Sequence, residues 1–243
     1  METLTTRPKM TTEHKLYWGV GILSALIFAG SLFMPGKPIE KTGLPWHIEH
    51  PAADTTRIFG LTLGLSTTDE AEQLFREEAK SSLFKSPDGK LVAEMFFEQV
   101  TLAGLKSKIV ISIAVPDAEL QGMYERGLRM SGTGSGKKIT LAPDDVARVR
   151  TLPISSLTYM PSVRLDEEIV SKRFGQPAQR IKEKKSGAVH WLYPQHGLDI
   201  TLGNDEKPVL QYVSPKDFDK LLQPLLTNGE ALGYQRLRQV ESH

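Results

Sequence analysis

The sequence predicts an α+β protein in which an N-terminal transmembrane helix is followed by two tandem units, each an antiparallel sheet with helices on one face. Three observations predict this fold class. A long charge-free run lies near the N-terminus, strand and helix signals alternate twice along the rest of the chain, and short turns separate the strands within each half. Short turns join antiparallel strands, and a sheet with one apolar face buries that face under helices.

The composition excludes several classes of protein. A chain of 243 residues can bury a core, and 40% hydrophobic with 24% charged residues is typical of a globular chain rather than a disordered one. The formal net charge of +1 argues against a protein that coats nucleic acid, so we expect no nucleic-acid partner. Because the chain has no cysteine, disulfides, Cys-bound metals, thiol nucleophiles and a lipid-bearing cysteine are excluded.

The charge-free run covers residues 16–36, LYWGVGILSALIFAGSLFMPG, between Lys15 and Lys37. At about 1.5 Å per residue, a helix of this length would span the hydrocarbon core of a bilayer. Tyr17 and Trp18 are predicted membrane-interface anchors, since amphipathic rings favour the headgroup region. The flanks of the run favour an uncleaved anchor over a cleaved signal peptide.

The charges that flank this run predict its orientation. More cationic groups precede the run than closely follow it, so the positive-inside rule places the N-terminus in the cytoplasm. We therefore expect a bacterial inner-membrane protein with a single pass, a cytoplasmic tail at residues 1–15 and a soluble domain in the periplasm. A cysteine-free chain tolerates that oxidising compartment.

The remaining chain divides into five predicted segments. They are a proline-rich tether at 37–54, a first α/β unit at 55–130, a linker at 131–152, a second α/β unit at 153–228 and a C-terminal tail at 229–243. Apolar strands end at Val115 and Val213, which are 98 positions apart, and a proline and an amphipathic helix follow each. Leu61 and Leu157, near the start of the two units, are 96 positions apart. Similar features at a constant spacing favour duplication of one unit.

Local patterns predict the individual elements. Apolar residues at helical spacing predict helices, and apolar runs bounded by Gly, Pro, Asn or Asp predict strands. The expected helices begin near Ser66, Pro116, Asp166 and Pro215, and the expected strands cover 90–102, 108–115, 188–193, 198–202 and 209–213.

No sequence motif predicts catalysis or a cofactor. The stretch SGTGSGKK at 131–138 resembles a phosphate loop, but it lacks the first glycine and the hydroxyl residue after the lysine, so we expect no nucleotide. We interpret it as part of the linker, with Lys137 and Lys138 as solvated cations. His47 and His50 in the tether are too few ligands for a metal site. We expect no metal, no cofactor and no enzymatic activity.

The segment 166–218 resembles a known family. Its helix leads into Arg173-Phe174-Gly175-Gln176-Pro177, followed by a hairpin with Trp191-Leu192-Tyr193-Pro194 and Gly197-Leu198-Asp199-Ile200 and by a last strand. This order is similar to the SmpA/OmlA envelope proteins and the β-lactamase-inhibitor-like fold. The resemblance implies tandem α/β units that bind other proteins by their sheet surface, without catalysis. The first half lacks the motif and no lipid-bearing cysteine is present, so the family's own partners are not implied.

The expected function is a membrane-anchored periplasmic protein-interaction module, an accessory or assembly subunit of an envelope complex with a protein partner. The candidate partner surface comprises His190, Trp191, Leu192, Tyr193 and His196. Aromatic residues dominate binding hot spots, but Trp191 and Tyr193 share one strand face and could instead fill the core beneath the helix at 215–226, leaving His190 and Leu192 exposed. The alternatives are a small-ligand or lipid-binding domain at the membrane surface and a hydrolase without a recognisable motif.

Overall fold

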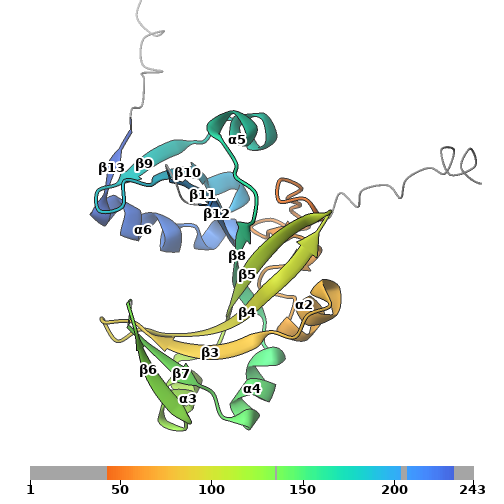
Figure 1. Ribbon diagram of the computed structural model, residues 1–243, viewed down its shortest axis with the longest axis vertical. Helices are drawn as coiled ribbons and strands as arrows, with labels where there is room; N and C mark the ends of the chain where they lie inside the picture. The colour runs from red at the N-terminus through yellow and green to blue at the C-terminus, as the bar shows by residue number, and fades with distance from the viewer. Residues whose placement is uncertain (1–42, 135, 204–206, 233–243) are drawn as a thin grey trace, which may run out of the picture. The chain divides into compact units, whose positions relative to one another are not determined.

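The computed structural model describes residues 43–134, 136–203 and 207–232 of the chain (Figure 1). Eleven of the described strands form a single antiparallel sheet, and two more form a short ribbon. Figure 1 shows the sheet continuing from a hairpin at one end to a short strand near the C-terminus at the other.

The strands are distributed over the whole described chain. Those of the first half are β1 (Arg57–Ile58), β2 (Leu61–Thr62), β3 (Lys80–Lys85), β4 (Leu91–Leu102), β5 (Leu105–Ile113), β6 (Arg129–Thr133) and β7 (Gly136–Thr140). Those of the second half are β8 (Ile154–Pro161), β9 (Gln179–Glu183), β10 (Val189–Tyr193), β11 (Leu198–Leu202), β12 (Val209–Val213) and β13 (Gly229–Ala231). The order across the sheet is β13-β9-β10-β11-β12-β8-β5-β4-β3-β7-β6. The five strands predicted from the sequence are confirmed to within a few residues.

The two halves of the chain meet at the centre of the sheet, where β5 pairs with β8 and Val110 lies opposite Thr158. On its other side β8 pairs with β12, so that Leu157 lies opposite Tyr212. The prediction of two tandem units with a sheet each is therefore wrong. Both halves contribute to one sheet, and the β5–β8 pairing satisfies the backbone groups that two separate sheets would leave unpaired at their edges.

The described helices are short. They are α2 (Thr68–Phe75), α3 (Asp117–Glu125), α4 (Pro143–Arg150), α5 (Glu167–Phe174) and α6 (Asp219–Asn228), with the 3-10 turns η2 (Pro194–His196) and η3 (Pro215–Asp217). The side chains of Thr67 and Asp166 accept hydrogen bonds from backbone N–H groups of α2 and α5 and so cap their first turns. Gly175 follows α5 with a φ of 78°, a backbone conformation that favours glycine.

Helices cover both faces of the sheet. Side chains alternate along β10, so Trp191 and Tyr193 belong to the main core, whereas Leu192 belongs to a smaller cluster on the opposite face. Each of α2, α3, α4 and α5 contributes buried residues to the main core. The apolar side of α6 packs instead on the smaller cluster, beside Ile181 and Phe218. The prediction of helices on one face is therefore wrong, because α6 lies on the side of the sheet opposite to the others.

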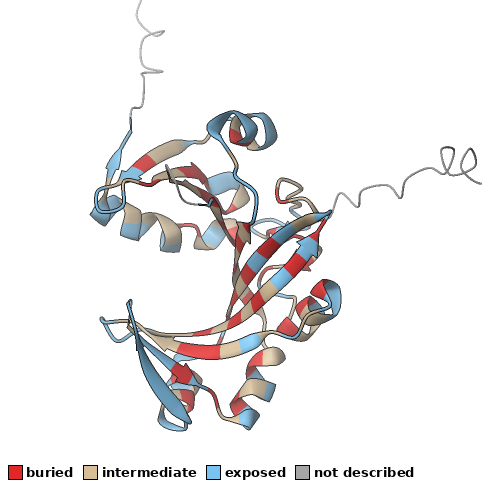
Figure 2. Cartoon of the chain, in the orientation of Figure 1, coloured by how far each residue is buried: buried red, intermediate tan, exposed pale blue. Residues whose placement is uncertain are grey.

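The resemblance between the two halves is limited to single elements. Leu61 lies in the two-residue strand β2 of the ribbon, whereas Leu157 lies in the central strand β8. The stretch predicted as a linker, 131–152, contains β7, α4 and most of β6. It is ordered into a hairpin and a helix because Ile139 and Val149 are buried in the main core (Figure 2).

The described part of the predicted tether packs against the second half of the sheet. The Tyr212 hydroxyl donates a hydrogen bond of 2.7 Å to the carbonyl of Pro45, and the Trp46 ring stands edge-on to Phe174 at a centroid distance of 6.4 Å. The Thr56 hydroxyl donates to the carbonyl of Val213 at 3.0 Å. We call residues 43–59 the strap, because these contacts hold the segment across the domain.

The predicted transmembrane helix at 16–36, with its interface anchors Tyr17 and Trp18, lies outside the described residues. Among the residues that the structure describes, no helix combines the length and the apolar character needed to cross a membrane. The described residues therefore do not bear out the predicted membrane anchor or the predicted localisation as a single-pass inner-membrane protein with a periplasmic domain, and neither is proposed below.

Candidate functional site

The predicted partner surface is mostly buried. Trp191, Leu192 and Tyr193 are 0%, 1% and 0% exposed. Trp191 and Tyr193 do fill the core, but on the face opposite α6, and Leu192 is the one that lies beneath α6. His190 and His196 keep partial exposure. Of the five residues of the predicted partner surface, only the two histidines are therefore accessible to a partner.

The two motifs on which the family resemblance rests contact each other. The rings of Phe174 and Tyr193 lie 6.1 Å apart, and the Tyr193 hydroxyl donates a hydrogen bond of 3.0 Å to the carbonyl of Gly175. Burial raises the pKa of Tyr193 to about 12, so the hydroxyl stays protonated and donates. On the same face, the guanidinium carbon of Arg180 lies 3.5 Å from the Trp191 ring centroid. These contacts join β10 to α5 and β9.

On the face beneath α6, His190 and Asp199 form a pair with little exposure. His190 Nδ1 lies 2.8 Å from Asp199 Oδ2 and 3.2 Å from the Thr201 hydroxyl. Burial raises the pKa of Asp199, and the hydrogen bond from His190 opposes that shift only in part. Catalytic triads contain such a pair, with a nucleophile at the other ring nitrogen. The described residues place no hydroxyl within hydrogen-bonding distance of His190 Nε2, so this pair orients the imidazole without completing a triad.

A second histidine pair joins the strap to the turn between β10 and β11. The rings of His50 and His196 stack with centroids 5.4 Å apart and an interplanar angle of 11°. His50 Nε2 lies 3.1 Å from His196 Nδ1, and His50 Nδ1 lies 2.7 Å from the carbonyl of Thr55. A carbonyl oxygen can only accept a hydrogen bond, so His50 Nδ1 carries a proton. A second proton, on His50 Nε2 or on His196 Nδ1, makes the hydrogen bond between the two rings. Burial, and secondarily the nearby His50, lowers the pKa of His196.

We expect the free energy of unfolding to fall as the pH drops below about 6.5, the ordinary pKa of histidine. His196 resists protonation in the folded state but not in the unfolded state, so the unfolded state binds more protons in this window and gains stability. Denaturant unfolding at several pH values should show a steeper loss for the wild type than for His196→Asn. The matched control is His47→Asn, because His47 contacts Glu49 instead of the pair. Parallel pH profiles for the wild type and His196→Asn would contradict this expectation.

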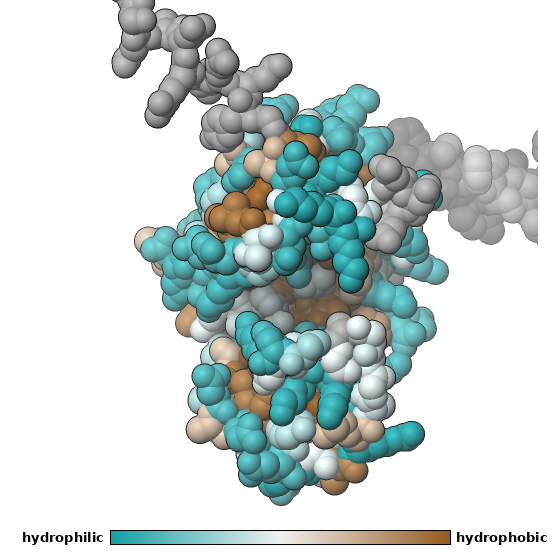
Figure 3. All heavy atoms as spheres, turned by 90° about the vertical axis from the view of Figure 1, so that its left-hand side faces the viewer, coloured by the Kyte–Doolittle hydropathy of each residue, from teal (hydrophilic) through white to brown (hydrophobic). Residues whose placement is uncertain are grey.

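One part of the sheet, on the face that carries α6, has no described helix over it. The helix α6 packs on β9, β13 and the smaller cluster that includes Leu192 of β10 and Val213 of β12, and the other described helices contribute to the opposite face. Partly buried apolar side chains occupy alternate positions of β3, β4, β5 and β8 on the open side: Phe84, Val92, Phe96, Val110 and Met160. We call these residues the uncovered face. Figure 3, which looks at this side, shows a hollow with hydrophobic residues at its base.

Charged groups lie among these apolar side chains. The strand register places Glu94 between Ser82 and Ser112. Within the described chain, the Glu94 carboxyl makes no hydrogen bond or ion pair, and burial raises its pKa. Lys108 extends over the Phe96 ring, with its nitrogen 5.9 Å from the centroid. The uncovered face therefore combines apolar area with a half-buried carboxyl that has no described cation beside it.

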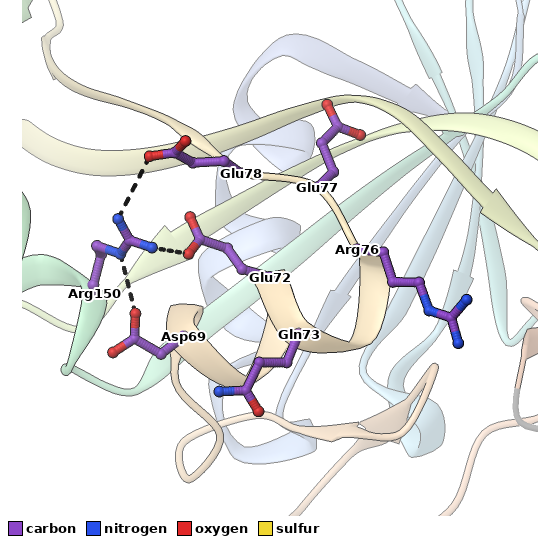
Figure 4. A pocket seen from close by; sticks show the side chains of 7 residues that line it. All are labelled: Asp69, Glu72, Gln73, Arg76, Glu77, Glu78 and Arg150. Carbon is purple, nitrogen blue, oxygen red and sulfur yellow. Dashed lines mark hydrogen bonds and ion pairs between the residues drawn. The ribbon is translucent and has the colours of Figure 1, made fainter.

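A shallow hollow of about 630 Å³ lies on the core side of the sheet, at α2 and α4 (Figure 4). Arg150 stands between three carboxylates: its nitrogens lie 3.0 Å from Asp69 and 3.7 Å from Glu78, and Glu72 pairs with it as well. The Glu77 carboxylate accepts hydrogen bonds from two backbone N–H groups of β4. Groups of this chain already bind these carboxylates, so the residues that line the hollow connect α2, α4 and β4.

We expect Arg150→Ala to lower the free energy of unfolding by about 1–3 kcal/mol, because Glu72 is left with little solvent and without its cation. The matched control is Arg148→Ala on the same helix, whose pair with Glu119 is exposed, so that its loss should cost less stability than the loss of Arg150. Chemical denaturation of both variants measures the difference. Equal losses of stability in the two variants would show that the ion pairs of Arg150 do not hold α2 and α4 together.

No protein-family model, curated protein or solved structure matches the chain. The resemblance to the SmpA/OmlA envelope proteins therefore stays a prediction. Within the described ranges, no three side chains able to ligate a metal come together.

Sequence reasoning missed the uncovered face, although one signal for it was visible. A strand with one solvated face alternates between apolar and polar residues. The run at 108–115, KIVISIAV, breaks that alternation because Val110 is apolar on the side that α6 leaves open. A strand that is apolar on both sides is expected to be covered on both sides. No described helix or strand covers the second side of this strand.

Proposed function

We propose that the described domain is a non-catalytic protein-interaction module that binds a partner protein on the uncovered face. One observation carries the proposal: an apolar sheet surface that no described helix covers, centred on Phe96 and Val110. Soluble chains rarely leave contiguous apolar area open unless it serves an interaction. The resemblance over 166–218, which implies binding by a sheet surface, supports the same function.

The charges on the uncovered face define the chemistry of the partner. Glu94 lies among apolar side chains and lacks a described cation, so a partner that presents a lysine or arginine beside apolar side chains would complement it. Burying an unpaired carboxylate is costly, whereas a partner cation offsets that cost. We therefore expect the partner to bring an apolar segment with one cation directed at Glu94.

Site-specific photo-cross-linking in the native host tests this proposal. A cross-linking amino acid at Val110 and another at Phe96 should capture the same protein, whereas one at Gln73, exposed on α2, should not capture it. Capture by itself is insufficient, so each cross-link is repeated with Glu94→Lys. The proposed complex predicts that Glu94→Lys abolishes the cross-link at an unchanged melting temperature.

Three outcomes would overturn the proposal. The first is equal capture from Gln73, the second is full capture with Glu94→Lys, and the third is the absence of any captured protein at Val110 and Phe96. A small apolar molecule recovered with the purified chain, together with no protein cross-link, would instead favour the ligand-binding alternative.

A further inference from the structure

The strand β6 forms an open edge of the sheet. It pairs with β7 along its whole length, and no other described strand pairs with it. All five residues from Arg129 to Thr133 are exposed, and Figure 2 shows the strand exposed from end to end. An edge strand presents unpaired N–H and C=O groups to solvent, and an extended chain can add to it as a further strand.

Uncompensated positive charge surrounds this edge. Arg129 lies on β6, Lys137 and Lys138 on β7, and Lys85 on β3, where it stands directly opposite Lys137. Like charges directly opposite each other on neighbouring strands are destabilising. Among the described residues, none of the four forms an ion pair: Lys85 lies over the Tyr124 ring at 4.2 Å, and Lys138 over the Phe84 ring at 5.9 Å.

The two sides of β6 differ in chemistry. Arg129 and Ser131 alternate with Met130, which lies opposite the buried Ile139. Met130 is 46% exposed, and Leu128 just before the strand is 66% exposed. A strand laid along β6 would therefore meet Arg129 and the neighbouring Lys138 on one face, and Leu128 and Met130 with the neighbouring Lys137 on the other.

We propose that β6 binds an extended acidic segment of the partner protein by strand addition, with acidic side chains alternating with apolar ones. This inference rests on the proposed function and names the partner's second contact. A second copy of the chain fits less well, because it would bring together two hairpins that each carry Arg129, Lys137 and Lys138. A nucleic acid would use the cations but not the exposed Leu128 and Met130.

A fluorescent peptide of alternating Glu and Val, titrated into the full chain, tests the edge directly. We expect saturable binding that weakens as salt is added, since the contacts are charged and exposed. A peptide of alternating Lys and Val, and an acidic peptide with proline at every second position, should not bind. Binding of all three peptides alike, or of none, would overturn strand addition.

Variants of the hairpin separate charge from backbone pairing. Arg129→Glu with Lys138→Glu should weaken the acidic peptide at least about tenfold, which is about 1.4 kcal/mol, whereas Lys216→Glu at an exposed cation on η3 should leave it unchanged. Ser131→Pro and Gly132→Pro form a second pair, because N–H groups of successive strand residues point to opposite sides. One of the two prolines removes an N–H group that points to β7, and the other removes an N–H group that points away from the sheet. The variant that keeps the wild-type melting temperature is the one that has lost the N–H group pointing away from the sheet, and it should not bind the peptide.

Further probes decide between the possible occupants. Duplex DNA or anionic vesicles that bind as tightly as the acidic peptide would overturn strand addition, and so would a dimer in sedimentation that the acidic peptide does not dissociate. The peptide titration reports only on β6, and the cross-link at Val110 reports only on the uncovered face. Failure of the edge proposal with an intact Val110 cross-link therefore leaves the interaction module standing.

Discussion

Trp191→Ala is expected to lower the free energy of unfolding by about 3–5 kcal/mol, the usual cost of truncating a large buried aromatic residue. Trp191 is fully buried at the centre of β10, with Arg180 stacked on its ring. The cavity would lie between β9, β10 and the main core, where β-strand neighbours on both sides limit collapse. Because domains of this size are stable by only about 5–15 kcal/mol, the variant should lose a large part of its stability.

Two further variants isolate the cause of this loss. Trp191→Phe keeps most of the volume and should cost much less, since Trp191 Nε1 has no described hydrogen-bond partner to lose. Trp46→Ala removes a partly exposed indole of the strap and should also cost less than Trp191→Ala. Denaturant unfolding of the three variants gives the ranking. A loss for Trp191→Ala no larger than that for Trp46→Ala would mean that β10 is not packed as the structure shows.

The local elements of this fold are largely predictable from the sequence. The hairpin strands β10, β11 and β12 follow from apolar runs separated by Pro194 to Gly197 and by a second turn, and α5 follows from its cap at Asp166 and its end at Gly175. In each case the deciding interactions join residues close together in the chain. Propensity, capping and turn chemistry act over that range.

The way in which the halves join is not predictable in this manner. The β5–β8 ladder pairs residues far apart in the sequence, and a strand that pairs in the middle of one sheet has the same apolar pattern as one in the middle of another. Glycine is rare in strands, so the glycines around Gly132 indicate a linker. The hairpin forms nevertheless, because Ile139 anchors β7 in the core.

The candidate sites differ in predictability for the same reason. Two aromatic residues in a hairpin indicate either a hot spot or a core, and only the packing of α5 and β9 against Trp191 decides between them. The uncovered face depends on which side α6 takes, and the amphipathic pattern of α6 is the same for either side. Stacking of His50 on His196 joins segments far apart in the chain, and no sequence spacing encodes it.

Gly197→Ala is expected to destabilise the domain more strongly than Gly89→Ala, which adds the same methyl group at another turn. Gly197 has a φ of 60°, where a side chain costs about 1–2 kcal/mol. A Cβ at this position would also overlap the carbonyl oxygen of Val213, and the Gly197 carbonyl accepts a hydrogen bond of 2.8 Å from the Val213 N–H. Since backbone atoms cannot rotate away as a side chain would, the β11–β12 pairing has to shift.

Gly89→Ala provides the matched control, because Gly89 has a φ of 90° but open space around its missing Cβ. It should cost only the conformational term of about 1–2 kcal/mol, whereas Gly197→Ala should cost at least about 1–3 kcal/mol more. The shift at Gly197 should also separate His196 from His50, so the pH dependence of unfolding should flatten in Gly197→Ala alone. Equal losses in the two variants, measured by denaturant unfolding, would contradict the close approach of Gly197 to Val213 and with it the seating of the strap on this turn.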